Sequence, residues 1–186
     1  MIKEKNIVLV GMPASGKSTV GVILAKVLGY RFLDCDLVIQ EQEGRRLSEI
    51  IEQDGIDGFM EIENRILSGI ETDRCVIATG GSAVYGDEAM KHLKENGTVV
   101  YLRVGIDLLL ERLNDLHQRG VVIKEGQTFE DLYSERSALY EKYADITVTE
   151  KSNSAFDVLE ETVEQLQFTG IIPGDITVRG SVTRER

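Results

Sequence analysis

Gly11-Met12-Pro13-Ala14-Ser15-Gly16-Lys17-Ser18 decides the fold of this chain, because it fits the pattern Gly-x-x-x-x-Gly-Lys-Ser/Thr. A β-branched apolar run, Asn6–Val10, ends directly before it, and apolar residues at helical spacing follow over Lys17–Leu28. Between a strand and a helix, such glycines let backbone N–H groups turn inward, and the positive end of the helix attracts phosphate. An ordinary glycine turn would have no reason to supply a lysine and a hydroxyl at this spacing. Residues 11–18 are therefore predicted to form a phosphate loop, in which Lys17 reaches the β- and γ-phosphates of a nucleotide and Ser18 offers its hydroxyl to Mg²⁺.

Apolar runs and helical stretches alternate over the rest of the chain. Strands are predicted at residues 30–33, 75–78, 98–102 and 146–148, and helices at residues 37–42, 87–95, 106–116, 129–143 and 155–166. This order predicts an α/β protein with the P-loop NTPase fold, in which a central parallel five-stranded sheet carries helices on both faces. Ligand sites of such folds lie outside the carboxyl ends of the strands, so the motifs are expected to meet there.

Length and composition narrow the class of protein. A chain of 186 residues with 42% hydrophobic residues can bury one sizeable core, so one domain is predicted over residues 1–168. The net charge of −11 repels a polyanion, so no nucleic-acid partner is expected, and no apolar run approaches the length of a membrane span. Two cysteines without a histidine cluster exclude a disulfide framework and a structural zinc site. The first residues do not read as a signal peptide, so a cytoplasmic location is expected. A monomer is also expected, although the sequence does not decide the oligomeric state.

Two segments stand apart from this pattern. Between Asp115 and Phe129 the sequence turns polar and carries two glycines, which favours a mobile lid at about residues 116–127, although a solvated loop has the same composition. The tail of residues 169–186 contains turn residues and the β-prone Ile176-Thr177-Val178. No role is assigned to this tail.

Asp34 and Asp36 follow the second predicted strand. If the extended geometry persists, two side chains at this spacing point the same way and face the phosphate loop. One carboxylate could then hold the metal through its water shell, while the other orients an acceptor hydroxyl or takes its proton. The alternative is structural, with Asp36 capping a helix and Asp34 solvated.

These residues resemble the shikimate kinase family, a branch of the nucleoside monophosphate kinase-like P-loop fold. The resemblance covers nearly all of residues 5–167. It is carried by GMPASGKST, YRFLDCD, DGIDGFMEIE, ATGGSAV, the spacing of Arg112 and Arg119, and ERSALYEKYAD. It implies transfer of the γ-phosphate of ATP, with Mg²⁺, to a hydroxyl of shikimate, a step of aromatic amino acid biosynthesis.

The resemblance also implies roles for particular residues. The implied catalytic residues are Lys17, Asp36 and Arg119. The implied nucleotide-binding residues are Gly11, Ala14, Ser15, Gly16, Lys17, Ser18, Thr19 and Arg112, and the implied metal-binding residues are Ser18 and Asp34. The implied substrate-binding residues are Asp36, Gly80, Gly81, Ser82, Arg136 and Met60, with Asp36 at the ring hydroxyls and Arg136 at the substrate carboxylate.

The chain departs from the family pattern at three places. Met60 stands where the family has an arginine that holds the substrate carboxylate, and methionine donates no hydrogen bond. Glu63, at i+3 on the same helix face, matches the acidic partner of that arginine and so lacks its mate. Ser82 replaces the third glycine of a Gly-Gly-Gly turn, and Arg119 is followed by Gly-Val-Val where the family has Pro-Leu-Leu.

Other functions stay open at this point. Met60 and Ser82 favour a related kinase whose acceptor is another small polyol or hydroxy acid. A non-catalytic ATP-binding module is a further alternative, although Lys17, Ser18 and the acidic pair speak against it. The Asp-x-Asp pair makes a nucleoside monophosphate kinase less favoured than a polyol kinase, and the chain lacks the Asn-Lys-x-Asp motif of guanine-binding switches.

Overall fold

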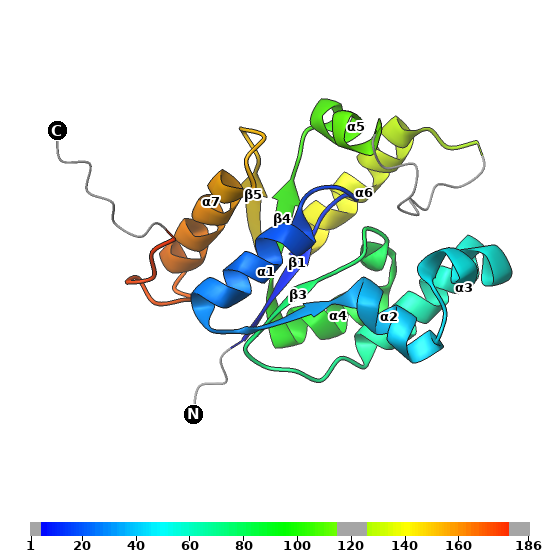
Figure 1. Ribbon diagram of the computed structural model, residues 1–186, viewed down its shortest axis with the longest axis horizontal. Coiled ribbons are helices and arrows are strands. Elements are labelled where there is room, and N and C mark those ends of the chain that lie inside the picture. The colour runs from blue at the N-terminus through cyan, green and yellow to red at the C-terminus, as the bar shows by residue number, and fades with distance from the viewer. Residues whose placement is uncertain (1–4, 115–125, 179–186) are drawn as a thin grey trace.

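The computed structural model describes residues 5–114 and 126–178 (Figure 1). Most strands and helices follow the order that the sequence predicts, but the long helix at Leu47–Ser68, which comes directly after another helix, was not among the predicted elements. The strands are β1 (Asn6–Val10), β2 (Arg31–Asp34), β3 (Cys75–Ala78), β4 (Gly97–Arg103) and β5 (Ile146–Thr149). The helices are α1 (Lys17–Leu28), α2 (Cys35–Glu43), α3 (Leu47–Ser68), α4 (Asp87–Asn96), α5 (Ile106–Asn114), α6 (Phe129–Tyr143) and α7 (Ala155–Phe168), with a short 3₁₀ turn at Ala83–Tyr85.

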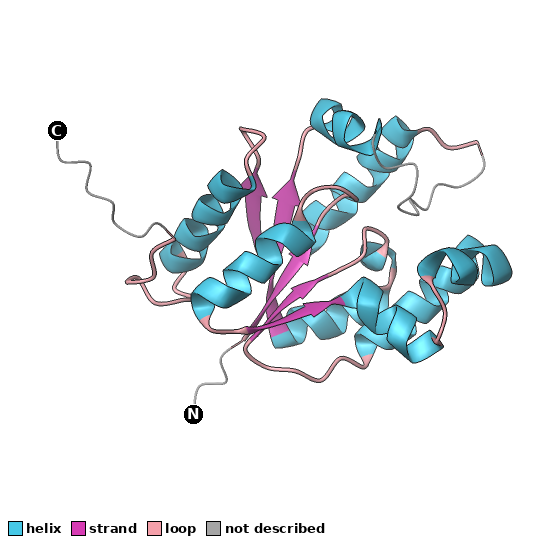
Figure 2. Ribbon diagram, viewed as in Figure 1, coloured by secondary structure: helices cyan, strands magenta, loops and turns pink. Residues whose placement is uncertain are grey.

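The five strands form one parallel sheet in the order β2-β3-β1-β4-β5 (Figure 2). Val8 of β1 is in register with Ile77 of β3 on one side and with Val99 of β4 on the other. Because all strands run the same way, the loops that follow β1, β2 and β3 leave from one edge of the sheet. This topology brings the phosphate loop, the acidic pair and the glycine turn after β3 together, as the sequence predicts.

Helices cover both faces of the sheet (Figure 2). Side chains of a strand alternate between the two faces, and in β1 both sets are fully buried. Val8 and Val10 belong to the core shared with α2, α3, α4, α5 and α6, whereas Ile7 and Leu9 belong to the core shared with α1 and α7. Burial on both faces explains why β1 reads as a continuous apolar run.

The boundaries of several elements differ from prediction. Helix α2 begins at Cys35, so Asp36 lies in its first turn and not in an extended segment. Helix α3 is broken at Gly55, whose φ is 75°, and it carries Phe59 and Glu63 into the core. Residues 176–178 do not form a strand, although Ile176 and Val178 pack against the core beside α1 and α7. Residues 116–125 of the predicted lid lie outside the described residues. The same holds for residues 115 and 116, the predicted end of the preceding helix.

Within the described part of the chain, no helix combines the length and the apolar composition needed to cross a bilayer.

Candidate active site

The phosphate loop curls around the ammonium group of Lys17. Lys17 Nζ donates hydrogen bonds of 2.8 Å to the carbonyl oxygens of Gly11 and Met12, and lies 3.4 Å from Ser15 Oγ. Ala14 has a φ of 65°, a conformation that costs a non-glycine residue free energy and is found where a surrounding structure imposes it. The loop is therefore held in a curved shape. Helix α1 follows it, and Gly16 at the N-cap position of this helix provides no side-chain hydrogen bond to the helix N-terminus.

A glycine is required at position 11, because strand β4 and the Ser15 side chain approach the start of the loop closely. Its φ is 152°, and a Cβ there would lie 2.7 Å from the carbonyl oxygen of Leu102 and 2.9 Å from Ser15 Oγ. The carbonyl belongs to β4 and cannot retreat without breaking the sheet. The first glycine of the motif thus joins β1 to the loop without displacing the neighbouring strand.

Burial lowers the pKa of Lys17 to about 8, and the nearby carboxylate of Asp36 opposes this effect. Removing an ammonium group from water disfavours its charged form, and an anion beside it restores that form. Lys17 is thus a buried cation next to Asp36. A phosphate at the loop would stabilise its charge further.

The acidic pair is arranged by the helix that follows β2. Asp34 caps α2, since its Oδ1 accepts a hydrogen bond of 3.0 Å from the backbone N–H of Asp36. The extended geometry does not persist to Asp36, because this capping bond starts the helix one residue after Asp34. The capping residue is Asp34 and not Asp36, which the structural alternative had named. Asp36 nevertheless lines the cavity beside the phosphate loop. Burial, followed by the charge of Asp34, raises the pKa of Asp36.

The residues predicted to hold Mg²⁺ fit that ion. Ser18 Oγ donates a hydrogen bond of 2.8 Å to Asp34 Oδ2, so a hydroxyl and a carboxylate lie side by side at the mouth of the loop. Mg²⁺ prefers a few such oxygens and takes its other ligands from water and phosphates. The described residues contain no cluster of three or more histidine, cysteine or acidic side chains that could hold a metal ion.

The glycine turn after β3 forms the floor of the site. Gly80 and Gly81 line the cavity, whereas Ser82 is buried behind them. Ser82 Oγ donates a hydrogen bond of 2.6 Å to Glu63 Oε2. The hydroxyl that replaces the third glycine therefore binds the carboxylate on α3, which explains how Glu63 is accommodated without an arginine at position 60.

Replacing Gly80 by Ala should lower both stability and activity. The added Cβ would overlap Glu63 Oε1 and would lie 3.1 Å from Asp36 Oδ1, so one of the two carboxyl groups must move. Overpacking of this kind costs about 1–3 kcal/mol. Denaturant unfolding and steady-state assays of the variant measure both effects, and Gly105→Ala, where nothing lies within 4 Å of the added atom, is the matched control. Unchanged values for Gly80→Ala would contradict the geometry of the floor.

Arg136 of α6 lies on the other side of the glycine turn and is only 1% exposed. Its Nε lies 3.5 Å from the hydroxyl of Tyr85, and its guanidinium packs over the Tyr85 ring. Its NH1 is so close to Gly81 that a Cβ there would come within 3.1 Å of it. Tyr140, one turn further along α6, donates a hydrogen bond of 2.7 Å to the Gly81 carbonyl. Helix α6 thus fixes this turn from behind.

Met60 is half-buried and packs against the core on the side of α3. It is not among the residues that line the cavity. Three of the predicted substrate-binding residues, Met60, Ser82 and Arg136, are therefore not among the residues that line this cavity with Asp36, Gly80 and Gly81.

Two cavities flank the phosphate loop. The first, of about 520 Å³, lies between the loop, Asp36 and the glycine turn. The second, of about 430 Å³, lies on the side of α7 and is bordered by Thr19 and Arg112. Ala14, Gly16 and Thr19 border both cavities. A phosphate chain on the loop would therefore lie between two cavities that are lined by different residues.

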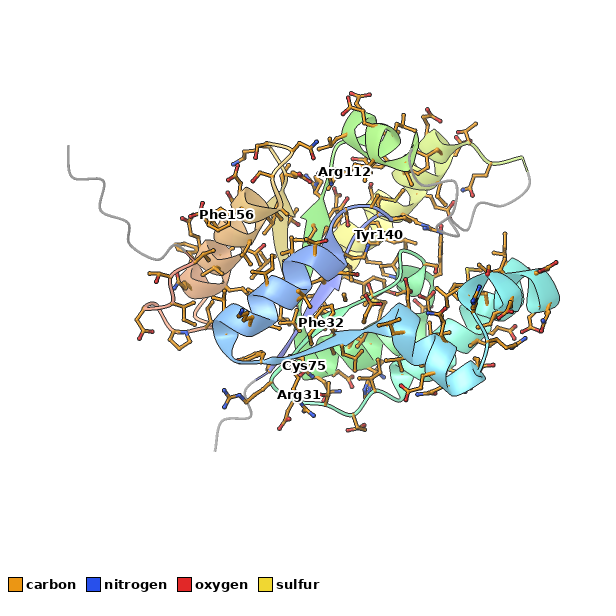
Figure 3. The ribbon with its side chains drawn as sticks, in the orientation of Figure 1. Arg31, Phe32, Cys75, Arg112, Tyr140 and Phe156 are labelled. Carbon is orange, nitrogen blue, oxygen red and sulfur yellow. The ribbon has the colours of Figure 1, made fainter. Side chains whose placement is uncertain are left out.

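Arg112 lines the second cavity and lies close to the phosphate loop (Figure 3). Its guanidinium donates to the Ala14 carbonyl at 3.1 Å, to Glu150 Oε1 at 2.6 Å and to Asn153 Oδ1 at 2.7 Å. Arg31 and Cys75, at the first residues of β2 and β3, lie at the opposite edge of the sheet (Figure 3). The site thus occupies only the carboxyl edge.

Several residues of the site were not predicted. Gln40, Arg46 and Ser48 line the first cavity, and Glu150 and Asn153 border the second. Arg46 follows Gly44-Arg45, and this basic pair after a glycine was an available signal. The others are ordinary polar residues whose position depends on how α2, α3 and the segment after β5 pack. Arg119 lies outside the described residues, so its predicted role has no structural description.

Comparisons with known proteins point to one family. The family model described as shikimate kinase matches residues 13–167. The chain is 32% identical to a shikimate kinase of Persephonella marina over 164 residues, which cover 88% of this chain and 99% of that protein. It is 36% identical to a shikimate kinase of Thermodesulfovibrio yellowstonii over 166 residues, covering 88% of this chain and 95% of that protein.

Solved structures agree with this similarity. The structure of shikimate kinase from Acinetobacter baumannii in complex with shikimate superposes with a TM-score of 0.79 at 33% identity, covering 89% of this chain and 94% of that one. Shikimate kinase from Aquifex aeolicus superposes with a TM-score of 0.75 at 32% identity, covering 89% of this chain and 98% of that one.

Proposed function

The chain belongs to the shikimate kinase family, and we propose that it transfers the γ-phosphate of ATP to a hydroxyl of shikimate. The observation that carries this proposal is the 520 Å³ cavity, which joins Lys17 and Ser18 of the phosphate loop to Asp36, Gly80 and Gly81. A phosphate donor and a hydroxylated acceptor could meet there. The similarity to shikimate kinases, one of them solved with shikimate bound, supports shikimate as that acceptor.

Phosphoryl transfer depends mainly on position and on neutralisation of charge. In the proposed reaction the phosphates lie on the loop, where Lys17 exchanges its carbonyl partners for phosphate oxygens. The acceptor lies on the glycine turn, with a ring hydroxyl held by Asp36. This carboxylate orients the hydroxyl and accepts its proton as the new phosphorus–oxygen bond forms and the bond to the β-phosphate oxygen breaks.

Mg²⁺, held by Ser18 and Asp34 next to the phosphates, would neutralise charge that develops on them. The second cavity is proposed to take the adenine side of the nucleotide, with Arg112 against it. Arg119 is proposed to complete the site from the lid, and the chain is proposed to act as a monomer in the cytoplasm. No role is proposed for residues 169–186.

A coupled assay of ADP release tests the proposal. With ATP, Mg²⁺ and millimolar shikimate, ADP release should depend on shikimate, and phosphorus NMR should detect a phosphate monoester of it. Asp36→Asn keeps the size of the side chain and removes its charge, and should therefore lower turnover. Absence of shikimate-dependent turnover in the wild-type protein would overturn the proposed function.

A second candidate is a kinase of another small polyol or hydroxy acid. The observation that favours it is Met60, a thioether at the position where the family resemblance implies a second cation for an acidic acceptor. A panel of hydroxylated metabolites in the same assay separates the two, because a higher kcat/KM for an acceptor other than shikimate would favour this candidate.

A further inference from the structure

Glu63 is a buried carboxyl group with only one of its oxygens hydrogen-bonded. The side chain is 1% exposed. Oε2 accepts the hydrogen bond from Ser82, whereas Oε1 has no hydrogen-bond partner among the described residues. A buried, unpaired carboxylate oxygen is costly, and in proteins such a group binds a ligand, takes up a proton or meets a cation.

The unpaired oxygen lies directly behind the cavity floor. A Cβ added to Gly80 would overlap Glu63 Oε1 and would also lie 3.1 Å from Asp36 Oδ1. Gly80 and Asp36 both line the cavity. Because Gly80 has no side chain, this oxygen packs closely against a residue that lines the cavity.

Charged and titratable groups face Glu63 from each element packed around it. Helix α2 contributes Asp36 and Cys35, α1 contributes Lys17, and α6 contributes Arg136 and Tyr140. Burial raises the pKa values of Cys35 and Tyr140 well above their usual range, so both stay neutral and add no charge. Among the described residues, the cations near Glu63 are therefore Lys17, which is proposed to bind phosphate, and Arg136, which packs on Tyr85.

We propose that Glu63 determines how strongly the cavity binds an anionic acceptor, which it admits when its carboxyl is neutral and repels when its carboxyl is ionised. This inference rests on the proposed function, because it concerns the carboxylate that shikimate carries. A neutral carboxyl adds no negative charge to the region that this carboxylate would enter. An ionised one, a few ångströms behind the floor, adds a like charge to the same buried region, where screening by water is weak.

Burial raises the pKa of Glu63 to about 7, against the opposing effect of the Ser82 hydrogen bond. The change of state therefore falls in a pH range that enzyme assays can cover. The carboxyl of shikimate is itself ionised throughout that range. Any change in its binding between pH 6 and 8.5 then reflects the protein and the nucleotide, not the charge of the acceptor.

The KM for shikimate across this pH range tests the inference, with the methyl ester of shikimate as an uncharged acceptor. For the wild-type enzyme the KM for shikimate should rise at least about tenfold from pH 6 to 8.5, while the KM for the ester should stay flat. In Glu63→Gln, which keeps an oxygen for Ser82 and cannot ionise, the KM for shikimate should stay near the low-pH value of the wild type. Glu61→Gln, an exposed position on the same helix, is the matched control and should behave as the wild type.

Each outcome has a separate meaning. A KM for shikimate that is independent of pH in the wild type, or an equal rise for shikimate and its ester, would overturn the inference while leaving the proposed function intact. An unchanged rise in Glu63→Gln would do the same. The comparison of acid and ester needs only the wild-type enzyme, so it holds even if the variant does not fold. No turnover with shikimate at any pH would overturn the proposed function, and this inference with it.

Discussion

Replacing Lys17 by Met is expected to lower kcat roughly a thousandfold while leaving the fold in place. Removing one preorganised charged donor from a site of developing negative charge costs about 10²–10³ in rate, and Lys17 is the cation enclosed by the phosphate loop. Methionine fills a similar volume, so the curve of residues 11–16 has no steric reason to collapse. Only the charge and its hydrogen bonds are lost.

Single-turnover measurements with saturating ATP and shikimate give this rate. Circular dichroism of the same sample reports whether the fold is retained. Lys26→Met removes an exposed lysine from the last turn of the same helix and should keep full activity. Activity of Lys17→Met within a few-fold of the wild type would refute the role assigned to the loop.

Replacing Glu63 by Gln is expected to flatten the dependence of the free energy of unfolding on pH. The pKa of Glu63 is 4.5 when the group is unperturbed and about 7 in the folded protein. A raised carboxyl pKa means that the folded state binds the proton more tightly than the unfolded state. The stability that comes from this proton is complete below pH 4.5 and is lost as the pH rises to about 7 and beyond. The loss amounts to about 3 kcal/mol.

Urea unfolding at intervals between pH 5 and 8 measures the effect. The wild-type free energy should fall relative to that of Glu63→Gln by most of this amount, roughly 2–3 kcal/mol, over this range, and Glu61→Gln should follow the wild type. Parallel curves for the wild type and Glu63→Gln would mean that the buried carboxyl is not protonated in the folded protein. This measurement needs no substrate, so it is independent of the activity tests.

The phosphate loop and the order of strands and helices were readable from the amino-acid sequence because their causes are local. Gly11 and Gly16 satisfy conformations that neighbouring residues impose, and the apolar run of β1 follows from its burial on both faces. The family resemblance was readable for the same reason, and it is confirmed by the match over residues 13–167. The predicted roles of single residues, such as Arg119 in the lid, stay predictions.

The packing of side chains behind the acceptor cavity could not be predicted from local sequence patterns. Asp34 and Asp36 were placed on one extended segment, but a capping hydrogen bond starts α2 between them. Ser82 and Glu63 are 19 residues apart and meet only because α3 packs under the turn after β3. The local pattern of a chain specifies helices, strands and tight loops through interactions over a few residues. The partners of a buried carboxyl depend on which elements lie side by side, and in this protein that contact gives Glu63 its hydroxyl partner and its raised pKa.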